Sequence, residues 1–201
     1  MPVLRLKHLM PFPGRVKLTP TSRWRIFYLS HLSNPASDRV IYRAIVQKKS
    51  YRILELGIAD GRRALRMIDA AAGLTSRSDI QYTGMDSFED RGETDGPGLS
   101  LIAAHRVLTR SGAKIKLIPG DPLRSLARAA NELGQVDLLV ISSQAEPDRL
   151  SRVWYFVPRL LHAQSRIFVE QALPGGKKTL LAVSAREVEQ WAAKAIRWKA
   201  A

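Results

Sequence analysis

The 201-residue sequence contains no cysteine, which excludes disulfide bonds and thiolate metal ligands. It also has no apolar run close to the roughly 20 residues that a membrane-spanning helix requires, and we find no signal-peptide core. The histidines lie far apart, without metal-ligand spacing: His8, His31, His105 and His162. From these absences we expect a cytoplasmic protein with no metal site and no membrane contact.

Acidic residues are scarce, with 18 Asp and Glu against 32 Lys and Arg, which gives a net charge of +14. The imbalance is greatest in residues 1–50, where ten Lys and Arg face one acid, Asp38. Such a basic arm attracts nucleic acid or another polyanion. A basic surface that only keeps the protein in solution has the same composition, and the arm holds no motif of a known nucleic-acid-binding module. Nucleic acid is therefore a candidate partner, and both interpretations stay open.

The length suits one domain with a full core. We expect a basic N-terminal arm over residues 1–35, irregular at its start because four prolines interrupt it, followed by a short extended or helical piece and a turn at residues 33–35. The domain then covers residues 36–201. Its first helix is predicted over residues 36–48, where Ile41, Ala44 and Ile45 recur at helical spacing.

From residue 51 onward, strand patterns alternate with helix patterns, which predicts an α/β fold with a doubly wound, mostly parallel sheet. The expected strands are residues 51–57, 80–86, 114–121, 136–142 and 165–171. The expected helices between them are residues 61–73, 98–112, 122–134 and 148–164. The last 25 residues hold one further strand, 178–184, and a helix over 184–198 that starts with a Ser184–Glu187 capping box. We therefore expect a sheet truncated after strand five or six, with a second subunit as a candidate source of the missing wall.

The turn after the first strand, "ILELGIADG", places an acid at the strand end and small residues at alternate positions after it. Ligands of open parallel sheets bind outside the carboxyl ends of the strands, and small residues let a ligand approach the backbone. The following helix N-terminus offers free N–H groups and a positive dipole. The Glu55 charge would repel a pyrophosphate and favours a ligand with an ammonium group or hydroxyls.

This turn resembles the first motif, acid-x-Gly-x-Gly-x-Gly, of class I (Rossmann-like) S-adenosylmethionine-dependent methyltransferases. Ala59 stands where the middle glycine is expected, and its methyl group is tolerated if its φ is negative. Asp86 ends the second strand 29 residues after Gly57, whereas the comparable acid of dinucleotide-binding folds follows by about 20. Asp121 follows the third strand. Both aspartates also suit helix or turn capping.

The resemblance implies S-adenosylmethionine (SAM) as the cofactor. Glu55 would meet its amino-acid end, Asp86 its ribose and Asp121 its adenine. Ser87 and Phe88 would lie beside the adenine. The candidate cofactor-binding residues are Glu55, Gly57, Ala59, Asp60, Gly61, Asp86, Ser87, Phe88, Asp121, Pro122 and Ser142.

The end of the fourth strand, "VISSQAEPD", carries neither the Asn/Asp-Pro-Pro-aromatic motif of amine methyltransferases nor the metal-holding Asp of catechol-type members. Glu170, at the end of strand five, is a candidate base or substrate anchor, and a lone helical His105 is expected to be structural or exposed. No catalytic residue is assigned. The predicted function is a methyltransferase of unknown acceptor. The alternatives are a catalytically inactive binding or scaffold protein that engages RNA through its arm, and a nucleotide-sugar or nicotinamide enzyme.

Overall fold

A computed structural model describes residues 20–92, 97–142 and 153–199 of the chain. Its centre is a six-stranded sheet with the order β3-β2-β1-β4-β5-β6, in which β6 runs antiparallel to β5 and the other neighbours are parallel. The strands are β1 (Arg52–Leu56), β2 (Gln81–Asp86), β3 (Lys114–Pro119), β4 (Val136–Ile141), β5 (Leu161–Ala172) and β6 (Lys178–Val183). The predicted α/β architecture with a mostly parallel sheet is confirmed.

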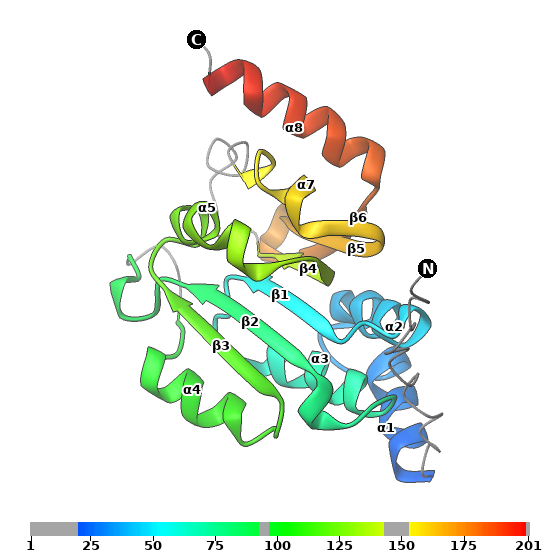
Figure 1. Ribbon diagram of the computed structural model, residues 1–201. Coiled ribbons are helices and arrows are strands. Elements are labelled where there is room, and N and C mark those ends of the chain that lie inside the picture. Colours follow the sequence, from blue (N-terminus) through cyan, green and yellow to red (C-terminus); the bar gives the residue numbers. More distant parts are fainter. Residues whose placement is uncertain (1–19, 93–96, 143–152, 200–201) are drawn as a thin grey trace, which may run out of the picture.

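Helices cover both faces of this sheet (Figure 1). One face packs against the layer that contains α2 (Arg39–Lys48), α3 (Arg62–Ala72) and α4 (Leu101–Thr109). The other packs against α5 (Pro122–Leu133), α7 (Val157–Leu160) and α8 (Ala185–Lys199). A helix on each face is what the right-handed crossovers between parallel strands require.

Strand β4 shows why the core has two halves. Leu138 and Val140 belong to the cluster under α2, α3 and α4, whereas Leu139 and Ile141 belong to the cluster under α5, α7 and α8. Successive side chains of a strand point to opposite faces, so a strand covered on both sides is apolar throughout. The continuous apolar run in the sequence therefore places β4 in the middle of the sheet.

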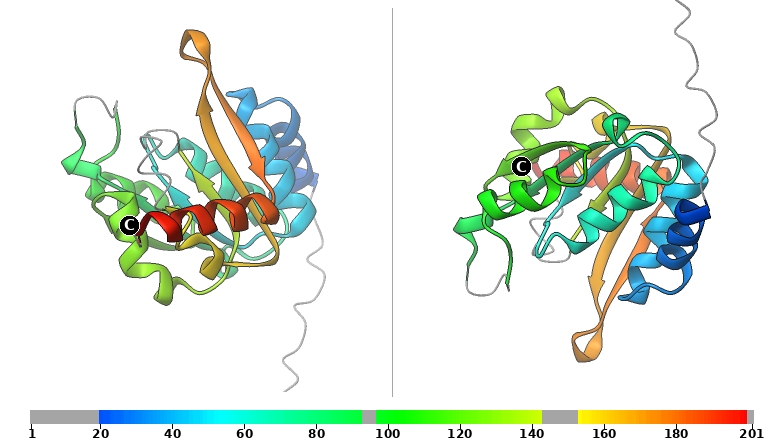
Figure 2. Two further views of the ribbon diagram at one scale, coloured as in Figure 1. Left: turned by 90° about the horizontal axis from the view of Figure 1, so that it is seen from above. Right: turned by 90° about the horizontal axis from the view of Figure 1, so that it is seen from below.

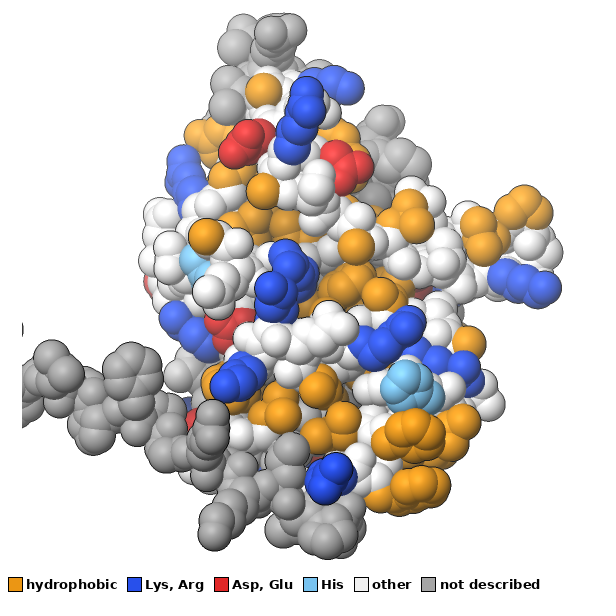
Figure 3. Space-filling model, turned by 90° about the vertical axis from the view of Figure 1, so that its right-hand side faces the viewer, with side chains coloured by type: hydrophobic (Ala, Val, Ile, Leu, Met, Phe, Trp, Pro, Cys, Tyr) orange, Lys and Arg blue, Asp and Glu red, His pale blue; other side chains and the backbone are white. Residues whose placement is uncertain are grey.

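Helix α1 (Pro20–His31) lies within the predicted arm, where the sequence left an extended or helical piece open. It packs against α2 and α3 through residues such as Leu29, which is buried. The predicted helix over 36–48 is a short 3-10 turn, η1 (Ala36–Asp38), followed by α2. The side of the molecule nearest α1 and α2 carries basic and hydrophobic side chains next to one another (Figure 3).

The helix predicted over residues 148–164 is wrong in its second half. Residues 148–152 lie outside the described residues, α7 has only four residues, and β5 begins at Leu161. The first residues of β5 are held in the sheet by side chains: Ser165 Oγ donates to the Val136 carbonyl at 2.7 Å, and a ring nitrogen of His162 lies 2.9 Å from Asp137 Oδ1. These contacts span more than 20 residues, so helical periodicity in the sequence could not reveal them.

The chain after β5 forms a long antiparallel hairpin with β6 that extends beyond the other strands (Figure 2). The turn is built on the 3-10 segment Pro174–Gly176. The predicted capping box of the last helix is confirmed, because Glu187 Oε2 accepts from the Ser184 N–H at 2.8 Å and Ser184 Oγ accepts from the Glu187 N–H at 3.3 Å. Among the described residues, no helix is long and apolar enough to cross a membrane.

Candidate functional site

The turn between β1 and α3 lies at the carboxyl edge of the sheet and depends on left-handed backbone conformations. Gly57 has φ 87° and Gly61 has φ 73°. A Cβ atom on Gly57 would lie 2.9 Å from the Ser142 Cβ, so the turn also needs glycine for its close packing against the end of β4. The Gly57 N–H donates to the Met85 carbonyl at 2.8 Å, which fixes the turn to the end of β2.

Ala59 has φ 52°, so the condition under which its methyl group would be tolerated without strain, a negative φ, is not met. The left-handed region brings an L side chain close to its own backbone, at a cost of about 1–2 kcal/mol. The alanine therefore has a backbone conformation that favours glycine. This chain therefore holds the turn under local strain at Ala59.

Asp86 shapes the same turn from β2. Its Oδ2 accepts from the Ile58 N–H at 2.6 Å and the Ala59 N–H at 3.1 Å, while its Oδ1 accepts from the Phe88 N–H at 3.1 Å. A carboxylate offers about four acceptor positions, and backbone amides fill three of them. The capping interpretation of Asp86 is therefore confirmed, and its predicted role toward a ribose depends on the fourth position.

Arg91 holds that fourth position. Its Nη2 lies 2.5 Å from Asp86 Oδ1, and only 9% of the Arg91 side chain is exposed. Arg91 was not among the predicted residues, because it stands in a stretch of the sequence that is otherwise acidic. Arg91 is the lone base between Asp86 and Asp95, and this contrast in charge was the available signal.

Glu55 is buried beneath the turn. The Tyr82 hydroxyl donates to Glu55 Oε2 at 2.5 Å, and within the described part of the chain Glu55 Oε1 has no hydrogen-bond partner. Burial raises the pKa of Glu55 to about 7, although the nearby Arg63 and the hydrogen bond from Tyr82 act in the opposite direction. A buried carboxyl with one unsatisfied oxygen is the kind of group that a polar ligand would complete.

Glu55 faces a cavity of about 210 Å³ whose lining carries charges of both signs. The lining includes four of the other candidate residues, Gly57, Ala59, Asp60 and Ser142. It also includes acids and bases that come from elements far apart in the sequence: Asp38, Arg62, Arg63, Arg66, Glu170 and Lys178.

Arg63 is the centre of this charged lining and was not among the predicted residues. Its Nη2 lies 2.5 Å from Glu170 Oε2 and 3.2 Å from Asp38 Oδ1, and its Nη1 donates to Ser142 Oγ at 3.2 Å. Burial alone would lower the pKa of Arg63, but the carboxylates around it have the larger, opposite effect. The pKa is therefore raised, and the side chain stays a cation. No spacing rule links these partners, because they meet only in three dimensions.

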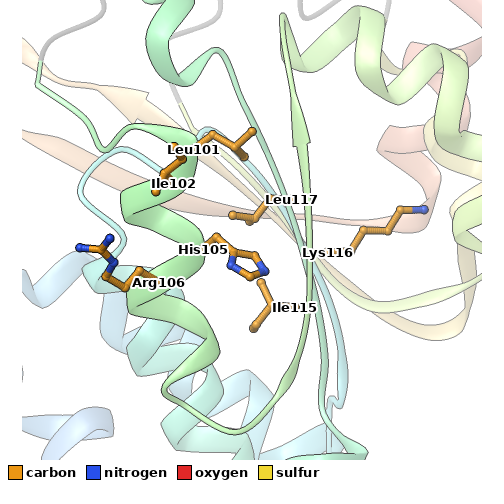
Figure 4. Close-up of a pocket in the computed structure, with 7 residues that line it drawn as sticks. All are labelled: Leu101, Ile102, His105, Arg106, Ile115, Lys116 and Leu117. Carbon is orange, nitrogen blue, oxygen red and sulfur yellow. The ribbon is translucent and has the colours of Figure 1, made fainter.

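Glu170 and His105, the two residues considered for catalysis, have different surroundings. Glu170 is buried at the end of β5, where it pairs with Arg63 and with Lys178, whose Nζ lies 2.8 Å from Glu170 Oε1. His105 is exposed on α4 and lines a second hollow of about 740 Å³ between α4 and β3 (Figure 4). Glu170 thus faces the candidate site as expected, and His105 lies away from it.

The other predicted residues lie at the ends of β2 and β3, next to the turn. Asp121 caps α5 by accepting from the Arg124 N–H at 2.9 Å, and Pro122 is the first residue of that helix. The Gly120 N–H donates to the Asp86 carbonyl at 3.0 Å, which brings the two strand ends together. The Phe88 ring is buried in the core next to this edge, and its place beside the adenine stays a prediction.

Parallel strands in the order 3-2-1-4-5, an antiparallel β6 and a glycine-bearing turn after β1 define the fold of class I SAM-dependent methyltransferases. The structure resembles an O-methyltransferase from Bacillus cereus in complex with SAH (TM-score 0.53, 14% identity, 94% of this chain and 80% of that chain).

It also resembles the O-methyltransferase TomG from Streptomyces achromogenes, involved in tomaymycin synthesis, in complex with SAM (TM-score 0.51, 13% identity, 91% of this chain and 78% of that chain). A third neighbour is a methyltransferase from Geobacter sulfurreducens (TM-score 0.50, 14% identity, 84% of this chain and 90% of that chain). No protein-family model and no curated protein matches the sequence. At such identities the likeness establishes the fold and leaves activity to be argued from the site.

Proposed function

We propose that this protein binds SAM at the carboxyl edge of its sheet and acts as a methyltransferase on an acceptor of unidentified class. The observation that carries the proposal is the buried, half-satisfied carboxyl of Glu55 beneath a close-approach turn, in a fold whose solved neighbours include complexes with SAM and SAH. Ligands of open α/β sheets bind at this edge.

The chemistry of the cavity fits the amino-acid end of SAM, which carries an ammonium and a carboxylate. An ammonium placed against Glu55 Oε1 would satisfy a buried acceptor and favour its ionised form. Two of the cations of the lining, Arg63 and Lys178, suit a carboxylate. The volume of about 210 Å³ lies below the roughly 300–1,000 Å³ of pockets that enclose a whole ligand, so the adenosine would extend past the turn toward Asp86.

A ribose hydroxyl can donate a hydrogen bond to Asp86 only if the Arg91 guanidinium gives up its own hydrogen bond to that carboxylate. The three backbone N–H groups on Asp86 belong to the turn that approaches the ligand, whereas Arg91 contributes a side chain alone. The proposal therefore includes a change of partner: Arg91 holds Asp86 in the free protein, and ribose hydroxyls hold it in the complex.

Bound SAM would supply an electrophilic methyl group on a sulfonium. The residues described here would bind and orient it, and positioning with exclusion of water contributes much of the rate of such displacements. Glu170 is held by two cations, so we assign it to organising the cavity. No residue is assigned as a base.

Calorimetric titration of the full chain with SAM and with SAH at pH 8 tests the proposal. We expect saturable binding of both ligands, weakened about tenfold or more by Glu55→Gln, which keeps the shape of the side chain and removes its charge. Glu132→Gln makes the same change on the exposed surface of α5 and should leave binding as it is. Equal binding by both variants would show that Glu55 does not meet the ligand.

A second candidate function is a binding or scaffold protein that has the fold without catalysis. The observation in its favour is that two acids at the edge already have cationic partners, with Arg91 on Asp86 and Arg63 on Glu170. An edge that is neutralised from within needs no cofactor for its own stability. If neither SAM nor SAH binds at millimolar concentration, this second function is the better conclusion.

A further inference from the structure

The outward face of α1 exposes large hydrophobic side chains to an unusual degree. Four of the seven large hydrophobic residues that are exposed in the described part of the chain lie within nine residues of one another, at helical spacing. They are Trp24 (66% exposed), Phe27 (46%) and Tyr28 (44%) in α1, and Leu32 (50%) directly after its end. The opposite side of α1 is already used for packing, since Leu29 is buried there. Exposed apolar clusters of this kind mark interaction sites.

Three rings of this face form a row along the helix. The Trp24 and Phe27 rings are stacked, with centroids 5.6 Å apart and planes at 28°. The Phe27 and His31 rings follow, with centroids 5.0 Å apart and planes at 35°. Flat rings that are held in order beside solvent are the platforms on which unpaired bases stack.

The surroundings of the row are basic. Arg23 is exposed on α1 itself, and Arg43 and Lys48 are exposed on α2, which packs against it. The acids nearby are already paired, Asp38 with Arg63 and Asp69 with Arg25 and Arg77. Figure 3 shows hydrophobic and basic side chains interspersed on this side of the molecule.

We propose that this aromatic–basic face of α1 binds single-stranded nucleic acid, with bases stacked on the Trp24–Phe27–His31 row and phosphates held by the neighbouring Arg and Lys. Arg23 lies one helical turn from Phe27, so charge and ring alternate within the face, whereas a helix that lies in a bilayer separates its charged side from its apolar side. A net charge of +14 also opposes the docking of a second copy. The inference is independent of SAM binding.

Fluorescence anisotropy with labelled 12-nucleotide single strands, one of RNA and one of DNA, tests this inference on the full chain. We expect binding that weakens as salt rises and that falls about tenfold for each ring removed in Trp24→Ala and Phe27→Ala. Ile102→Ala removes an equally exposed apolar side chain on α4 and should change nothing. Trp24→Phe keeps a ring and should retain most of the affinity.

Three results would overturn the inference. Binding that depends on salt but is identical in the ring variants would show that charge alone attracts the strand. Binding to anionic lipid vesicles that Trp24→Ala abolishes, without binding to either strand, would assign the face to a membrane. A dimer in sedimentation that the same substitution dissociates would assign it to a second copy of the chain.

Discussion

Replacing Arg91 should make the protein bind SAH more tightly, because the structure places Arg91 where a ribose would have to bind. Backbone amides take three of the acceptor positions of Asp86, and the guanidinium takes the fourth at 2.5 Å. A hydrogen bond to a charged group is worth about 1.5–3 kcal/mol when it is removed. In Arg91→Ala the ligand no longer has to break this hydrogen bond when it binds. The dissociation constant of SAH should therefore fall by about tenfold to a hundredfold.

Calorimetry with SAH on the wild type, Arg91→Ala and Arg110→Ala measures this effect. Arg110→Ala is the control, because it removes the same charge from an exposed position at the end of α4. It measures only the effect of losing one positive charge from the protein's electrostatic field. In the absence of ligand, Arg91→Ala should also melt slightly earlier, since Asp86 loses one partner. If the ligand binds and its affinity is unchanged or weaker in Arg91→Ala, the ribose does not replace Arg91 on Asp86 and the reasoning fails.

Three further outcomes follow from the same edge of the sheet. Ala59→Gly should raise the free energy of unfolding, measured by urea denaturation, by about 0.5–1 kcal/mol, because relief of the left-handed strain exceeds the entropy that glycine adds to the unfolded chain. The control Ala103→Gly, inside α4, should lower the free energy of unfolding. Because the pKa of Glu55 is raised to about 7 from 4.5, its stabilisation is complete below pH 4.5 and is lost as the pH rises through 7. Between pH 4.5 and pH 7 the free energy of unfolding of the wild type should therefore fall by about 3 kcal/mol relative to that of Glu55→Gln. If the free energies of unfolding of the two proteins change in parallel with pH, Glu55 is not buried as the structure has it. Arg63→Gln should cost about 3 kcal/mol or more in denaturant melts, because Glu170 and Asp38 would stay buried without their shared cation, and a loss below 1 kcal/mol would show that the network is solvated.

The sequence predicted the elements whose signals are local. The apolar run of β4, the glycines of the β1–α3 turn and the Ser184–Glu187 capping box each depend on neighbours along the chain, and each was confirmed. The start of β5 at Leu161 was missed because its stabilising contacts reach back to Val136 and Asp137 on another strand.

The sequence predicted where the candidate site lies, but not which side chains pair with its acids. Glu55 and Asp86 lie at the ends of adjacent strands, as the alternation of strands and helices requires. Their partners did not follow from spacing, because Arg63 and Arg91 are surface-type residues that only tertiary contacts bury. The sign of φ at Ala59 was also beyond the sequence, since alanine usually adopts negative values and the turn imposes a positive one.

The guanidinium of Arg63 also has a consequence for the order in which the chain is completed. It joins Asp38, near the start of the domain, to Glu170, which is 107 residues further along the chain than Arg63 itself. On the ribosome the early half emerges long before Glu170, so Arg63 lacks this second carboxylate until β5 docks. A nascent chain that stops short of β5 therefore has Asp38 but not Glu170 beside Arg63, and only a chain that includes β5 completes this network of charges.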